Sequence, residues 1–348
     1  MPTPQVFTTL IQGIKESAYG TATTPTTASV SWIPHYVDSP AFQPRALRHI
    51  LDEGFRGVAG QDFDLIPGPG NGTVSFNGDV YLDAFPHILQ NMMGTDAVSG
   101  SYVHTMTAAT NPPSYSYFWS QGVQSYTFPG TRLTSIRLSF NSADGALTYS
   151  AQGTSKLGVA SGAAGANAAW TLGATGANTG TPSTIYPAIP ALGLAGWQGA
   201  MTISDSVGGT ARQMGSTGYA SVMEGEITFS RQLTPIHSLT GTQDISVIYA
   251  GPLQVQARLT MDWYDASIYN FFATGISGVG ANTNSVVLTF TQGAQSMAIT
   301  ITKAAWRQVD IERSGAIYTQ VGNVTGLYSS TDSGPAKVVV TNSVTTGY

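Results

Sequence analysis

The chain has 348 residues, enough for two domains of ordinary size. Charged residues make up 9 % and hydrophobic residues 42 %, which excludes the high-charge, low-hydrophobicity composition of disordered proteins. The absence of cysteine excludes disulfides, thiol catalysis and thiolate metal sites, and the net charge of −5 argues against an electrostatic grip on nucleic acid.

The first 28 residues predict a polar arm with one short apolar run from Phe7 to Ile14. The N-terminus lacks a basic start followed by an apolar core, so we expect no signal peptide. No window of the sequence approaches 18 consecutive apolar residues, so we expect no membrane anchor. Charges are also sparse against a usual value of roughly 25 %, and such a surface suits a protein that packs against copies of itself.

Residues 51–72 contain six glycines and two prolines and show almost no periodicity. This composition predicts a long exposed loop or a two-stranded flap, and long ordered loops usually have a function. Apolar side chains within the segment have no periodic face of their own to join, so we expect a partner subunit to cover them. The tentative interface residues here are Phe55, Arg56, Val58, Phe63, Leu65 and Ile66.

A pattern of about twenty residues occurs twice, at 72–94 and at 251–273. Each copy begins with alternating apolar and polar residues, which predicts a strand with one buried face. Each then spaces its apolar residues as one face of a short helix. In the first copy, Asp83 and Pro86 suit the start of that helix and Gly94 suits its end. The repeat predicts two similar β-rich halves, each with a short helix.

Residues 131–154 predict a β-hairpin that turns at Asp144-Gly145. Residues 306–322 echo it, since Arg307 and Gly315 lie 170 positions after Arg137 and Gly145. We therefore expect Arg137 and Arg307 to be equivalent interface residues. Between the hairpins the chain becomes rich in Gly and Ala. The expected organisation is a first domain at 1–155, a linker or surface loop at 156–200, and a second, divergent domain at 201–348.

The sequence offers little for catalysis or metal binding. The five histidines do not fall at metal-ligand spacing, so we expect structural or surface roles for them, no catalytic residues and no cofactor. The glycine cluster at 68–72 precedes an alternating strand rather than a helix, which favours a turn over a phosphate-binding loop. The acidic pairs at 52–64 could bind calcium, although solvent or a neighbouring subunit is the simpler partner.

Four segments together resemble the tail tube proteins, or major tail proteins, of long-tailed bacteriophages. They are the opening stretch Gly13–Thr21, the flap with Gly54-Phe-Arg56-Gly57, the strand–helix unit at 74–94 and the hairpin at 133–153. The likeness spans most of residues 13–155, and 201–325 look like a second copy. The family is defined by pattern more than by invariant residues.

The resemblance implies a mainly β protein, with a duplicated tail-tube β-sandwich or barrel and a short helix in each half. It implies a structural virion protein of the phage tail, made in the host cytoplasm and without enzymatic activity. Subunits would form rings that stack into a tube for DNA delivery, with DNA crossing the lumen without specific binding. A tape measure protein and tail-end proteins are the further partners that the family implies.

Two alternatives remain open from the sequence. Two tube folds in one chain favour a trimeric ring with pseudo-sixfold symmetry over a hexamer carrying the second half outside. A different class of function is a monomeric β-sandwich that binds carbohydrate or acts as an enzyme, using tryptophans such as Trp119, Trp170, Trp197 or Trp263 as a platform. Aromatic residues are also common at protein interfaces, so they do not separate these classes.

Overall fold

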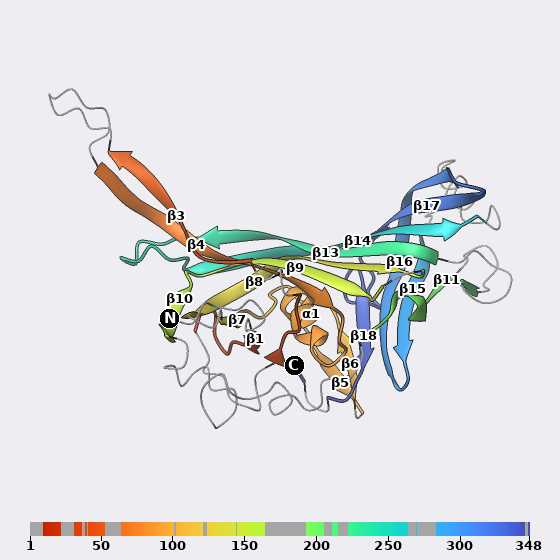
Figure 1. The fold of residues 1–348 in the computed structure, drawn as a ribbon, viewed down its shortest axis with the longest axis horizontal. Coiled ribbons are helices and arrows are strands. Elements are labelled where there is room, and N and C mark those ends of the chain that lie inside the picture. Colours follow the sequence, from red (N-terminus) through yellow and green to blue (C-terminus); the bar gives the residue numbers. More distant parts are fainter. Residues whose placement is uncertain are drawn as a thin grey trace, which may run out of the picture.

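The fold of a computed structural model is mainly β and antiparallel, as the sequence predicts (Figure 1). The structure describes residues 10–21, 31–36, 39, 41–52, 64–100, 102–120, 124–143, 145–163, 193–204, 211–214, 222–263, 269, 283–344 and 347–348. Within these ranges, helix α1 is the one α-helix that is fully delimited.

The first half of the chain holds most of the short strands and helix α1. Its elements are β1 (Leu10–Lys15), β2 (Ser31–Trp32), β3 (Ala41–Asp52), β4 (Asp64–Asp79), α1 (Phe85–Met93), β5 (Ala97–Ser99), β6 (Val103–Met106), β7 (Tyr115–Ser120), β8 (Gln124–Asn141), β9 (Thr148–Ser155) and β10 (Val159–Ala163). Strand β10 therefore lies inside the stretch expected to be a linker, where it pairs with β8.

The second half is built from long strands. Its elements are the 3₁₀ turn η5 (Gly196–Gln198), β11 (Gly199–Ser204), β12 (Ala211–Met214), β13 (Val222–Ile236), β14 (Val247–Asp262), β15 (Thr283–Gln292), β16 (Gln295–Ser314), β17 (Ile317–Gly326) and β18 (Lys337–Thr341).

One long strand in each half takes part in two sets of pairings. The first part of β8 pairs with β7 and β10, and its second part pairs with β9 and β13. In the same way, the first part of β16 pairs with β15 and β18, and its second part pairs with β17. Each hairpin that follows turns at a glycine with positive φ, Gly145 or Gly315. This shared arrangement supports the inference that the fold is duplicated.

The two halves join edge to edge in one long sheet. Residues 135–141 of β8 pair with 224–230 of β13, and the order across the sheet is β3-β4-β9-β8-β13-β14-β17-β16. In Figure 1 this sheet runs across the molecule, with α1, β1 and β7 below its first half. We call the β8–β13 pairing the seam.

The first strand–helix unit is present as predicted, with one correction. Alternate residues of β4 are buried, α1 has a proline in its first turn, and it ends at Gly94, whose φ of 113° favours glycine. Asp83, however, does not cap α1. Its carboxylate accepts hydrogen bonds from the backbone and side chain of Ser343, at 3.0 and 2.8 Å. In the second unit β14 forms the predicted strand, and its helix falls at residues outside the described ranges, apart from the helical Tyr269.

Candidate functional site

One face of the long sheet is polar over most of its length. Period-two alternation places the apolar side chains of β4, β8, β13 and β14 in the core and the others on the opposite face. Cross-strand pairs align the latter in rows, such as Asn77, Ser150, Arg137, Thr228, Gln256 and Thr325. We call this surface the polar face. Its members are Ser75, Asn77, Asp79, Ser135, Arg137, Ser139, Thr148, Ser150, Gln152, Glu224, Glu226, Thr228, Ser230, Gln254, Gln256, Arg258, Thr260, Asn323 and Thr325.

Hydroxyl and amide groups dominate the polar face. Its charged members are two arginines, Arg137 and Arg258, and three acids, Asp79, Glu224 and Glu226. The net charge of the polar face is therefore slightly negative. Tight binding of a phosphate backbone needs clustered Lys and Arg, which this surface lacks.

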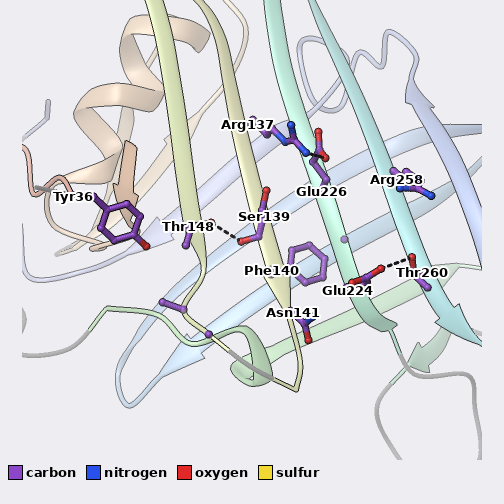
Figure 2. Close-up of a pocket in the computed structure, with 13 residues that line it drawn as sticks. Tyr36, Arg137, Ser139, Phe140, Asn141, Thr148, Glu224, Glu226, Arg258 and Thr260 are labelled. Atoms are coloured by element: carbon purple, nitrogen blue, oxygen red, sulfur yellow. Dashed lines mark hydrogen bonds and ion pairs between the residues drawn. The ribbon is translucent and has the colours of Figure 1, made fainter. Parts of the chain in front are cut away.

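Arg137 lies on the polar face at the seam. Its guanidinium forms an ion pair with Glu226 on the neighbouring strand β13 (Figure 2). The Arg137 side chain is 58 % exposed, so solvent screens the pair and its contribution to stability is small. Arg137 thus connects the two halves within one chain, and the contact between subunits that the sequence predicts for it stays a prediction.

Arg307, the counterpart of Arg137 in the sequence echo, lies at a bulge of β16 between Trp306 and Gln308. It lines a shallow depression with Glu226 and Arg258, so it borders the polar face as Arg137 does. It forms no ion pair with the described residues. The second part of β16 pairs with β17 on one side and has no partner on the other among the described strands.

The flap consists of a β-hairpin that projects from the body of the molecule (Figure 1). Strands β3 and β4 pair from Ala41↔Ser75 out to Asp52↔Asp64. Of the predicted contact residues, Ile66 pairs with Ile50 and is 48 % exposed, and Leu65 lies beside it in β4. Phe55, Arg56, Val58 and Phe63 lie outside the described residues. The structure thus gives the two-stranded form of the flap, and β3 has β4 as its partner among the described strands.

The side chain with the most hydrogen bonds beside the seam is that of Arg231, which no motif in the sequence indicates. It is 6 % exposed and donates hydrogen bonds to the carbonyl oxygens of Met92, Met93, Ala109 and Gly251 at 2.8–3.2 Å. The first two carbonyls belong to the last turn of α1, where cations are favoured. Burial, with a smaller contribution from the nearby positive charge of Arg132, lowers the Arg231 pKa to about 10. A side chain from the second half therefore holds the helix of the first.

The opening stretch that resembles the family arm folds around a buried carboxylate. Glu16 accepts hydrogen bonds from Ser114 Oγ and Ser116 Oγ at 2.6 Å, from the Gly130 amide at 2.7 Å and from the Gly20 amide at 2.8 Å. Four donors satisfy the carboxylate despite its burial. This contact fixes the stretch that follows β1 against β7 and β8.

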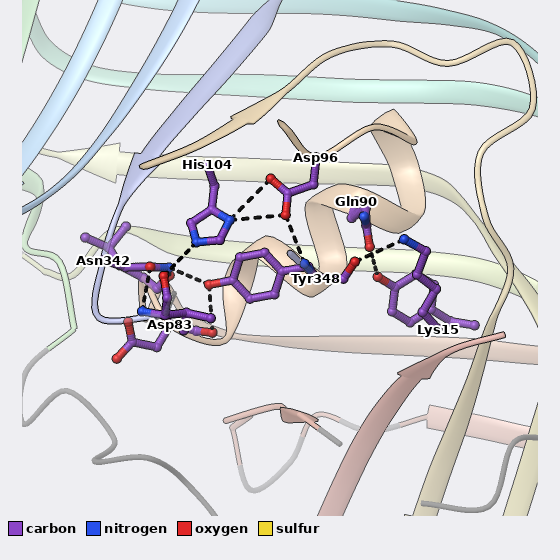
Figure 3. A network of polar contacts seen from close by, with 10 residues as sticks. Lys15, Asp83, Gln90, Asp96, His104, Asn342 and Tyr348 are labelled. Atoms are coloured by element: carbon purple, nitrogen blue, oxygen red, sulfur yellow. Dashed lines mark hydrogen bonds and ion pairs between the residues drawn. The ribbon is translucent and has the colours of Figure 1, made fainter. Parts of the chain in front are cut away.

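The end of the chain docks on the first half (Figure 3). Strand β18 pairs with β16 and with β6, so it links the two halves. His104 lies between Asp96, with Nδ1 3.1 Å from Oδ2, and the Val344 carbonyl, 3.0 Å from Nε2. The Tyr348 ring packs against the rings of His87 and His104, with centroids 4.6 Å apart in both cases. These histidines hold structure together, in line with the role expected for them.

Among the described residues, no group of three or more His, Cys, Asp or Glu residues could hold a metal ion. No described helix is long and apolar enough to cross a membrane.

A family model described as phage tail tube protein matches residues 7–345, nearly the whole chain. No curated protein matched the chain in a sequence comparison.

Proposed function

Because the chain belongs to the phage tail tube protein family, we propose that it assembles into stacked rings that form the conduit for DNA in the phage tail. The family is structural and non-enzymatic, and it places the chain in the virion tail. The observation that carries the proposal is the long sheet, in which one tube-like half continues into another by ordinary strand pairing.

The seam offers a template for contacts between chains. Inside the chain, the second part of β8 pairs with β13, the outer strand of the β13–β14 hairpin. The corresponding strands are the second part of β16 and β3, the outer strand of the flap hairpin. Pairing β16 of one chain with β3 of the next would satisfy the open backbone groups of both edges and continue the sheet. Such a heterologous contact closes into a ring when the rotation permits.

This template favours three chains in each ring. Each chain would supply two places, so a trimer would have pseudo-sixfold symmetry. The alternative is a hexamer in which the second half decorates the outside. The seam argues for the trimer, because β13 extends the sheet of the first half directly rather than packing behind it.

In such a ring the polar face lines the lumen, because the opposite face of the sheet is the protein core. A lining of hydroxyls and amides with a slightly negative balance lets DNA pass without binding it tightly. The projecting flap reaches a neighbouring subunit, and its exposed Ile66 is covered there. A tape measure protein inside the tube and tail-end proteins at its tips are further partners of such an assembly.

The experiment is negative-stain microscopy of the purified chain together with mass measurement of isolated rings. Tubes with three chains per ring are expected. A stable monomer on gel filtration would instead favour the carbohydrate-binding or enzymatic β-sandwich. Six chains per ring, with residues 201–348 projecting outward, would contradict the trimer but leave the tube.

The flap is tested by deletion of residues 54–68. The shortened chain should remain folded and soluble but form no tubes. Normal tubes from this variant would show that the flap is not needed for contacts between subunits. Binding of the wild-type tube to duplex DNA at physiological salt would contradict the expected lumen.

A further inference from the structure

The second half exposes apolar side chains at both ends of one hairpin. Tyr249 lies near the start of β14 and Trp263 follows its end, 14 residues later, which corresponds to about 45 Å along the strand. Between these ends the exposed positions of β14 are polar apart from Pro252, as on the rest of the polar face. The large exposed apolar side chains of the β13–β14 hairpin and of strand β17 therefore lie near the two opposite ends of β14.

The first rim lies at the turn between β13 and β14. Leu239 is fully exposed at the tip, Tyr249 is 62 % exposed, and Ile236 is 40 % exposed on the same strand end. The turn is held by its own hydrogen bonds, including the Ser246 amide to the Ile236 carbonyl at 2.8 Å. These hydrogen bonds give the turn a defined conformation. We call Ile236, Leu239 and Tyr249 the leading rim.

The second rim lies where β14 ends beside β17. Trp263 donates its backbone amide to the Tyr318 carbonyl at 3.1 Å, and the two rings meet edge to face with centroids 6.2 Å apart. With Ile317 and Asp262 they line an open depression of about 540 Å³. Tyr318 is 59 % and Ile317 45 % exposed. We call Trp263, Ile317 and Tyr318 the trailing rim.

In the first half, the corresponding strand end is covered by a residue of the same chain. There Val80 donates to the Leu147 carbonyl, as Trp263 does to Tyr318. Leu194 then inserts, donating to the Val80 carbonyl at 3.1 Å and accepting from the Leu147 amide at 2.7 Å, and its side chain is buried. In the second half the β16–β17 hairpin continues instead to Ser314↔Ile317, and its apolar end faces outward.

We propose that the leading rim of one chain docks on the trailing rim of a chain in the next ring, with Leu239 filling the depression beside Trp263 and Tyr318. This inference rests on the proposed tube. The occupant is a second copy, because the two rims lie at opposite ends of the same strands and so meet when rings stack head to tail. Leu239 of one ring would then cover the end of the second-half hairpin in the next ring, just as Leu194 covers the corresponding end within the first half.

The absence of cysteine from the chain permits a direct test by crosslinking. The double variant L239C/Y318C, assembled into tubes and oxidised, should give a ladder of linked chains on a non-reducing gel. The ladder should collapse to single chains on reduction. Either single variant should give no ladder, because each rim then lacks its partner thiol.

The matched control is Q254C/Y318C, since Gln254 is an exposed residue in the middle of β14. It should give no ladder in the same tubes. A ladder from the control equal to that of L239C/Y318C, or tubes of L239C/Y318C without any ladder, would overturn the inference and leave the tube intact. Failure of the wild-type chain to form tubes would instead refute the proposed function.

A second measurement uses charge rather than thiols. L239D and Y318D should each leave rings intact and reduce tube formation at least tenfold, because stacking would bury an unpaired carboxylate. The double mutant should be no worse than either single variant. Normal tubes from both single variants would contradict the contact.

Discussion

The two halves share one arrangement of strands but are secured in different ways. Buried polar side chains fix the helix and the N-terminal stretch of the first half: Asn91 bridges α1 to β8, Arg231 from β13 of the second half holds the end of α1, and Glu16 gathers four donors. In the second half, the described long strands end in exposed turns and apolar rims.

If the proposed rings form, this difference separates the contacts that one chain makes alone from the surfaces that it leaves for other copies. Contacts inside a chain persist in the monomer, so they can be buried and polar. Contacts between copies must remain soluble before assembly, which suits small apolar patches separated by hydroxyls and amides. The following variants test this division, starting with the largest expected effect.

Replacing Arg231 by Ala should produce the largest loss of stability. Four backbone carbonyls lose their donor, two of them at the end of α1, and hydrogen bonds to a charged group contribute strongly. We expect the free energy of unfolding to fall by about 3 kcal/mol or more. Urea denaturation followed by circular dichroism measures it.

The control is R231K, which keeps the charge but not the planar fork of donors. It should recover part of the loss. If R231A unfolds at the wild-type urea concentration, the two halves are not held together by this side chain.

Asn91 and Asn270 provide the sharpest test of the duplication. Asn91 donates to the Thr131 carbonyl at 3.2 Å and accepts from the Leu133 amide at 3.0 Å, all buried. N91A should cost about 2 kcal/mol, since both backbone groups lose their partner. Asn270 lies outside the described residues but is the identical residue of the second copy in the sequence, so the repeat predicts a similar cost for N270A by the same measurement. A neutral N270A beside a damaging N91A would break the equivalence of the two units.

Much of the fold could be predicted because its signals are local. Alternation over 72–82 and 251–261 predicts β4 and β14, Pro86 and Gly94 delimit α1, and glycine turns mark the hairpins. The echo between Arg137 and Arg307 likewise correctly predicts strands at both positions. These features depend on residues close together in the chain.

The contacts that join the halves could not be predicted in this way. Arg231 is one arginine in an alternating strand, and nothing near it in sequence indicates that its partners are at 92, 93 and 109. Asp83 was misread as a helix cap because its true partner, Ser343, lies 260 residues away. Contacts between residues so far apart in sequence depend on which strands become neighbours in the sheet. That order is determined by the fold of the whole chain and not by any local pattern.

Acid should weaken the docking of the chain's end on α1. Burial, with His104 and Lys15 nearby, lowers the pKa of His87 to about 3, while an unfolded histidine titrates near 6.5. The unfolded state therefore binds the proton first, and the stability that neutral His87 provides above about pH 6.5 is lost as the pH falls toward 3. The full loss expected from this pKa difference is on the order of 5 kcal/mol.

The variant H87F keeps an aromatic ring against Tyr348 without a titrating group. Urea midpoints measured between neutral and acidic pH should fall less steeply for H87F than for the wild type. Parallel pH profiles for the two proteins would show that His87 does not carry the effect.

The smallest effects on stability are expected at Arg137 and Arg307. Arg137 forms its ion pair within the chain, whereas the partner proposed for Arg307 lies on the next chain of the ring. R137A removes an exposed ion pair with Glu226 and should cost no more than about 0.5–1 kcal/mol in the isolated chain. R307A should leave the isolated chain unchanged, since Arg307 forms no ion pair with the described residues. In tube assembly, R307A should have the larger effect of the two variants. If β16 pairs with β3 of the next chain, R307A removes a contact that only the ring possesses. The melting temperature measures the stability of the isolated chain, and the lowest protein concentration that gives light scattering from tubes measures assembly. Equal assembly by the two variants would mean that the seam within the chain is not the template for the contact between chains.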